Sequence, residues 1–62
     1  MKIGDRVKCI RSEREKIYSV GTIYEVEGLA GIGAMLLRDN DGDLDSIPIP
    51  MNGAFWDFEL VE

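Results

Sequence analysis

Hydrophobic and polar residues alternate in two stretches of the chain, one near each end, and this alternation predicts β-strands. In residues 6–11, Val7 and Cys9 fall on one face while charged side chains fall on the other. In residues 56–60, aromatic and aliphatic side chains alternate with acidic ones. Because successive side chains of a strand point to opposite faces, each stretch has one face suited to a core and one suited to solvent.

Further segments follow between these two stretches. Residues 18–26 are rich in β-branched and aromatic side chains, which predicts a second strand. Residues 12–16 include four charged residues and no apolar one, and they predict an exposed loop or at most one helical turn. Residues 28–33 contain three glycines, which predict a turn because glycine adopts positive φ angles at little cost.

An Asp-Gly pair at positions 41 and 42 separates two apolar runs and predicts a β-hairpin closed by a two-residue turn. Such a turn places Arg38 opposite Asp45, a favourable pairing of charges. It also places Leu36 opposite Ile47. The predicted apolar face of this hairpin consists of Ala34, Leu36, Ile47 and Ile49.

The pattern as a whole predicts an all-β protein. Five short strands, turn signals at roughly ten-residue spacing and the lack of helical periodicity suit a small five-stranded barrel. The 62 residues are expected to form a single domain, 1–62, with a thin core.

Four short segments carry a resemblance to a known group of proteins. They are Gly4-Asp5-Arg6-Val7, Gly21-Thr22-Ile23-Tyr24-Glu25-Val26, Asp39-Asn40-Asp41-Gly42 and Phe58-Glu59-Leu60-Val61. In this arrangement, which spans nearly the whole chain, the sequence resembles the small SH3-like barrel proteins encoded by tailed bacteriophages. The resemblance implies an SH3-like barrel and an accessory protein in the cytoplasm of a bacterial host. It implies no particular activity, since one fold can carry many functions.

Charge narrows the range of partners. Seven Lys and Arg against twelve Asp and Glu give a net charge of −5, and all cations but Arg38 lie in the first sixteen residues. An acidic chain repels a phosphate backbone, so direct nucleic-acid binding is not expected. No apolar stretch approaches the ~20 residues of a membrane helix, so no membrane association is expected. The single cysteine, Cys9, cannot form an intramolecular disulfide, which favours a reducing cytoplasm.

The residue types also argue against catalysis. The chain has no histidine, so Cys9 has no imidazole to activate it, and its strand phase with Val7 predicts a buried thiol. Aspartates at positions 39, 41, 43 and 45 alternate as in a calcium loop. However, Leu44 and Pro50 stand where such a loop needs its glycine and its bidentate glutamate. We therefore expect no enzyme activity, metal or cofactor.

Aromatic and acidic residues make up the candidate partner-binding site. Tyr18, Phe55 and Trp56 border predicted loops, where a ring can be partly exposed and anchor a protein partner, although core packing is equally open for this group. The acidic rim of the site is predicted at Asp41, Asp43, Asp57 and Glu59. A possible homo-oligomer interface is predicted at Ile32, Met35, Ile47 and Ile49, since so small a core leaves little room for every apolar residue.

Three functions fit these observations. The leading hypothesis is a non-enzymatic interaction module that binds and modulates a bacterial host or phage protein. The second is a homo-oligomer that captures a small nucleotide-like ligand with its N-terminal cations and so counters host defence signalling. The third is an acidic mimic of DNA that occupies the groove of a DNA-binding protein.

Overall fold

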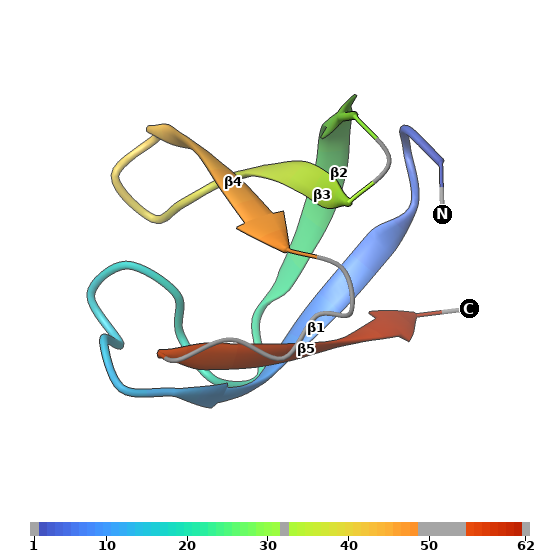
Figure 1. Cartoon of the computed structure of the whole chain (residues 1–62). Coiled ribbons are helices and arrows are strands. Elements are labelled where there is room, and N and C mark those ends of the chain that lie inside the picture. Colours follow the sequence, from blue (N-terminus) through green and yellow to red (C-terminus); the bar gives the residue numbers. More distant parts are fainter. Residues whose placement is uncertain (1, 32, 49–54, 62) are drawn as a thin grey trace.

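The computed structural model describes residues 2–31, 33–48 and 55–61, and the predicted fold class is confirmed. The strands are β1 (Arg6–Ser12), β2 (Ile23–Ala30), β3 (Ala34–Arg38), β4 (Leu44–Pro48) and β5 (Trp56–Val61). They pair antiparallel in the order β4-β3-β2-β1-β5. The sheet curls into a small half-barrel, which brings β4 above β5 in Figure 1 although these strands are at opposite ends of the order. In the described part of the chain, no helix is long and apolar enough to cross a membrane.

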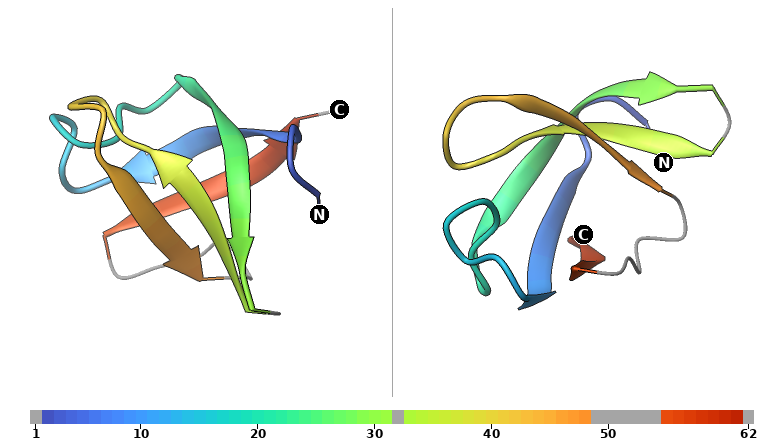
Figure 2. Two further views of the ribbon diagram at one scale, coloured as in Figure 1. Left: turned by 90° about the horizontal axis from the view of Figure 1, so that it is seen from above. Right: turned by 60° about the vertical axis from the view of Figure 1, so that its left-hand side comes forward.

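Strand β2 makes the curl possible because it pairs with two neighbours in succession. Its first residues, Ile23 to Glu25, pair with β1, and the part from Val26 to Ala30 pairs with β3. The register shifts between Val26 and Gly28, and such a bulge bends a strand and increases its twist. Figure 2 shows β2 crossing from one half of the sheet to the other. Gly28 also permits close packing, since a Cβ there would lie 2.9 Å from Cδ1 of Leu36.

The core fills the concave side of this sheet. Alternate residues of β1, of the first half of β2 and of β3 are buried, as the period of two requires. The buried residues are Val7, Cys9, Tyr18, Tyr24, Val26, Met35, Leu37, Ile47 and Phe58, with Ile17 and Trp56 packed against them. The alternation predicted for residues 6–11 is therefore confirmed, since Val7 and Cys9 are buried. Of the three residues predicted to face inward in residues 56–60, Phe58 is buried as expected. Leu60, predicted to face inward, is exposed.

The predicted limits of the second strand are wrong at both ends. Strand β2 begins at Ile23, and residues 14–22 form turns instead, closed by bonds such as Tyr18 N to the carbonyl of Arg14 at 3.1 Å. At the other end, β2 continues to Ala30 through the predicted glycine turn. Only Gly31 has positive φ among the glycines described there, at 60°, so the sharp turn is confined to the end of that stretch.

The predicted two-residue hairpin turn is also wrong. Asp39 N donates to the carbonyl of Asp43 at 2.9 Å, which closes a loop of residues 39–43 between β3 and β4. The carboxylate oxygen Oδ1 of Asp39 accepts the backbone N–H of Asp41 at 2.9 Å and that of Asp43 at 3.0 Å. A side-chain acceptor that satisfies two loop amides stabilises this wider loop.

The wider loop shifts the hairpin register by one residue. Leu37 lies opposite Asp45 and Met35 opposite Ile47, so the inward face contains Met35 and Leu37 instead of Ala34 and Leu36. Arg38 consequently lies opposite Leu44, and its guanidinium pairs with Glu27 across β2 and β3 at 3.3 Å.

This register removes two residues from the predicted oligomer interface. Met35 is fully buried and Ile47 is 3% exposed, so neither is available to a second copy without unfolding of the hairpin. Ile32 and Ile49, the other two predicted interface residues, lie outside the described residues.

Candidate functional site

Tyr18 organises the aromatic interior, and its predicted role as an exposed anchor is wrong. The side chain is 0% exposed. Its ring lies edge-on to Tyr24, Trp56 and Phe58, with centroid distances of 5.0, 4.8 and 5.2 Å. We call these four rings the Tyr18 cluster. The cluster buries a large apolar area between the β1–β2 loop and β5, in the geometry that aromatic pairs prefer.

The hydroxyl groups of this cluster connect it to β4 and to the β3–β4 loop. Tyr18 OH donates to Oδ2 of Asp45 at 3.1 Å, and burial raises the pKa of Tyr18. Tyr24 OH donates to Oδ1 of Asn40 at 2.9 Å and accepts the backbone N–H of Ser19 at 2.9 Å. Each buried hydroxyl thus has a partner, as burial of a polar group requires.

Asn40 joins the β1–β2 and β3–β4 loops. Its backbone N–H donates to the carbonyl of Ile17 at 2.9 Å. Its Nδ2 donates to the hydroxyl of Ser19 at 3.0 Å and to the carbonyl of Glu15 at 3.3 Å. These three hydrogen bonds attach the β1–β2 loop to the β3–β4 loop.

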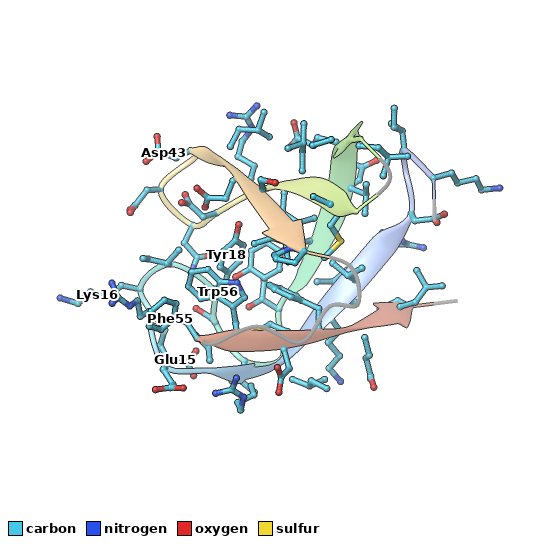
Figure 3. All side chains as sticks on the ribbon, in the orientation of Figure 1. Glu15, Lys16, Tyr18, Asp43, Phe55 and Trp56 are labelled. Atoms are coloured by element: carbon cyan, nitrogen blue, oxygen red, sulfur yellow. The ribbon has the colours of Figure 1, made fainter. Side chains whose placement is uncertain are left out.

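Phe55 presents the exposed aromatic surface. It is 43% exposed and tilted against Trp56 at a centroid distance of 5.8 Å. The Arg14 guanidinium lies over its ring, 4.5 Å from the centroid, a cation–π geometry. The backbone N–H of Glu13 donates to the Phe55 carbonyl at 2.7 Å, which fixes the ring position relative to the loop. Figure 3 shows Phe55 and Trp56 beside the loop that carries Glu15 and Lys16.

Trp56 connects this surface to the interior. Its side chain is only partly exposed, because one side of the indole packs on Tyr18. Phe55 and Trp56, together with the Arg14 guanidinium over the Phe55 ring, form what we call the Phe55 surface. Of the three predicted aromatic anchors, the structure brings these two together at the surface and places Tyr18 beneath them.

The four predicted acidic rim residues fall in two separate places. Asp41 and Asp43 lie in the β3–β4 loop, and Figure 3 places Asp43 well above Phe55. Asp57 and Glu59 lie on β5. Asp57 accepts a hydrogen bond from Nε of Arg11 at 2.8 Å, and Glu59 is registered opposite Lys8. These two acids therefore face cations of the same molecule.

Strand pairing also places N-terminal cations next to acids. Arg6 lies opposite Glu25, and Arg11 pairs with Glu13 at 2.7 Å as well as with Asp57. Hydrogen bonds to Asp57 and then to Glu13 raise the pKa of Arg11. The folded sheet thus sets three cations of the basic stretch, Arg6, Lys8 and Arg11, opposite acids, and the fields of such local pairs largely cancel at a distance.

Candidate catalytic groups are few in the described part of the chain. Cys9 is buried as predicted, and desolvation raises the pKa of its thiol, which disfavours the reactive thiolate. Among the described residues, no group of three or more His, Cys, Asp or Glu side chains could hold a metal ion.

Sequence reasoning missed Asn40 and Asp45, the two residues that receive the tyrosine hydroxyls. Asn40 resembles an ordinary turn residue, and its contacts with residues 15–24 have no local signal in the sequence. Comparison of the chain with protein-family models, curated proteins and solved structures finds no match.

Proposed function

We propose that this chain is a non-enzymatic interaction module that binds a protein through the Phe55 surface. The proposal extends to a phage accessory role, in which the partner is a bacterial host or phage protein. The observation that carries it is the exposure of the Phe55 ring on a backbone that the β1–β2 loop holds in place. A rigid aromatic side chain gives a large contact area at little cost in conformational entropy, and such residues dominate binding energy at interfaces.

The neighbouring side chains support a peptide-like partner. Arg14 lies over the Phe55 ring, and Lys16 belongs to the loop beside it (Figure 3). The acids Glu13 and Glu15 already accept hydrogen bonds, from Arg11 and from the backbone N–H of Val20. An apolar side chain of the partner would contact Phe55, and a carboxylate or carbonyl of its chain would meet the two cations. The surface offers an anchor with a polar rim, as interface hot spots do.

The alternatives receive less support. A nucleotide-binding assembly was expected to use Met35 and Ile47 as interface, and both are buried within one molecule. A DNA mimic needs a row of unpaired acids, whereas Asp57 and Glu59 face Arg11 and Lys8. Both observations favour a protein partner over these two roles.

The test is affinity capture from bacterial lysate with the wild-type chain and two matched variants. Phe55→Ala removes the exposed ring and should lose the captured protein. Ile10→Ala is the control: this residue is 47% exposed and lies on β1, away from the Phe55 surface, so capture should persist. Retention of the same partner by Phe55→Ala would reject the proposed surface.

A further inference from the structure

Arg14 is held in place both at its backbone and at the end of its side chain. Its N–H donates to Oγ of Ser12 at 3.1 Å, and its carbonyl accepts the N–H groups of Ile17 and Tyr18 at 2.9 and 3.1 Å. At the other end, the guanidinium lies over the Phe55 ring, 4.5 Å from the centroid. A guanidinium over an aromatic face keeps its N–H donors, which lie in its own plane and can still form hydrogen bonds. Arg14 therefore presents a fork of donors in a defined position beside the ring.

These donors are not used within the part of the chain that the structure describes. No hydrogen bond or ion pair of the Arg14 guanidinium is found there. The two acids next to Arg14 in the sequence have other partners, since Glu13 accepts from Arg11 at 2.7 Å and Glu15 accepts the N–H of Val20 at 2.7 Å. A cation with unused donors beside exposed apolar surface suits an anion that brings an apolar group with it.

The apolar part of the Phe55 surface lies directly beside this fork. Phe55 is 43% exposed, and the partly exposed Trp56 lies at a centroid distance of 5.8 Å from it. In an extended segment, neighbouring side chains point to opposite faces, and those on one face are about 6–7 Å apart. A C-terminal residue instead carries its carboxylate and its side chain on one Cα. With the guanidinium only 4.5 Å from the ring centroid, the terminal residue fits better than an internal acidic and apolar pair.

The charge of the whole chain favours the same choice. The net charge is −5, so a segment rich in Asp or Glu is repelled by the molecule as a whole. A chain terminus brings a single negative charge. A planar guanidinium binds that carboxylate with two parallel hydrogen bonds, which are among the strongest that side chains form.

We propose that Arg14, Phe55 and Trp56 bind the C-terminal carboxylate and the apolar last side chain of a partner protein. The carboxylate accepts two N–H groups of the Arg14 guanidinium, and the last side chain contacts the exposed parts of Phe55 and Trp56. This binding mode rests on the proposed function of the Phe55 surface, because it names the chemistry of the partner there.

The experiment is a backbone amide NMR titration of the full chain with three short acetylated peptides. The probe ends in leucine with a free carboxylate, the second peptide is its C-terminal amide, and the third is that amide with a glutamate two residues before the leucine. The free acid should shift the amides of Arg14, Phe55 and Trp56. Both amidated peptides should bind at least about tenfold more weakly, because the terminal ion pair is lost.

Three results would overturn the proposal. They are equal dissociation constants for the free acid and its amide, tighter binding of the glutamate peptide than of the free acid, and no response to the free acid at millimolar concentration.

Two variants separate the guanidinium fork from simple charge. Arg14→Lys keeps the positive charge but loses the planar fork, so the free acid should bind about tenfold more weakly. Lys2→Gln is the control, because it removes a cation next to the N-terminus, which Figure 1 shows on the side of the molecule away from the start of β5. Its affinity for the free acid should match that of the wild type. An unchanged affinity in Arg14→Lys contradicts the binding mode.

Failure of this binding mode is distinguishable from failure of the proposed function. A captured partner that is lost in Phe55→Ala but kept in Arg14→Lys rejects only the carboxylate contact. A partner that is kept in Phe55→Ala rejects the surface itself.

Discussion

The ring of Tyr18 contacts three other aromatic rings, and its hydroxyl donates to Asp45. Its position in a loop would usually imply exposure, yet the side chain is fully buried and its ring packs against Trp56 and Phe58 of β5. The same residue therefore fills the core and supports Trp56. A loop residue with this role cannot be found from strand periodicity, because the loop has none.

Replacement of Tyr18 by Phe should test the hydroxyl separately from the ring. The ring contacts remain, while one hydrogen bond to a partly exposed carboxyl group is lost, so we expect a loss of about 1 kcal/mol in the free energy of unfolding. Urea denaturation with fluorescence of Trp56 measures this. Tyr18→Ala, which leaves a large cavity, should cost about 3–5 kcal/mol. An equal loss of unfolding free energy in Tyr18→Phe and Tyr18→Ala would contradict the described packing of the Tyr18 ring.

Cys9 offers a probe of the closed core at the residue scale. The thiol is fully buried and its pKa is raised by desolvation, so at neutral pH both access and thiolate fraction are low. We expect a thiol-specific reagent to label Cys9 much more slowly in the folded chain than in urea, with a rate that increases with pH. Rapid labelling of the native protein at neutral pH would contradict the burial of Cys9.

At the scale of the element, the β3–β4 hairpin illustrates what the sequence can and cannot predict. The Asp-Gly signal correctly located a turn, and Gly42 indeed has a φ of 87°. The register was missed because Asp39 accepts two loop amides and closes a wider loop, and that choice depends on side-chain hydrogen bonds instead of periodicity. In β1, by contrast, alternation alone identified the inward residues Val7 and Cys9.

A glycine pair tests the loop geometry. Gly42→Ala places a Cβ on a residue with positive φ and should cost about 1 kcal/mol of unfolding free energy. Gly33→Ala is the matched control, since no atom lies within 4 Å of its added Cβ and its φ is outside the positive range, so stability should barely change. Both are measured by urea denaturation. A neutral Gly42→Ala together with a costly Gly33→Ala would contradict the described turn.

At the scale of the whole molecule, the half-barrel explains how so short a chain holds the Phe55 surface in place. Composition and alternation predicted an all-β fold, and strand pairing then decided which charges meet. The pairing of Arg11 with Asp57, and the register of Lys8 opposite Glu59, turn a basic N-terminal stretch and an acidic C-terminal stretch into one mixed surface. Residues far apart in sequence determine these pairs, so linear charge counts could not predict them.

The Phe55 surface depends on this arrangement. Its backbone is held by Glu13, its ring by Arg14, and its neighbour Trp56 by the buried Tyr18. The Phe55 surface is thus supported by the β1–β2 loop and the aromatic core together. A partner that docks there should perturb the loop and the start of β5 before any other element.

Backbone amide shift mapping with the captured partner tests this central claim most directly. Addition of the partner to the isotope-labelled chain should produce the largest shifts in residues 13–17 and at Phe55 and Trp56, with little change at Ile10 and Ile23 on the outer face of the sheet. The largest shifts at Ile10 and Ile23, with residues 13–17 and Phe55 unaffected, would contradict the proposed binding surface.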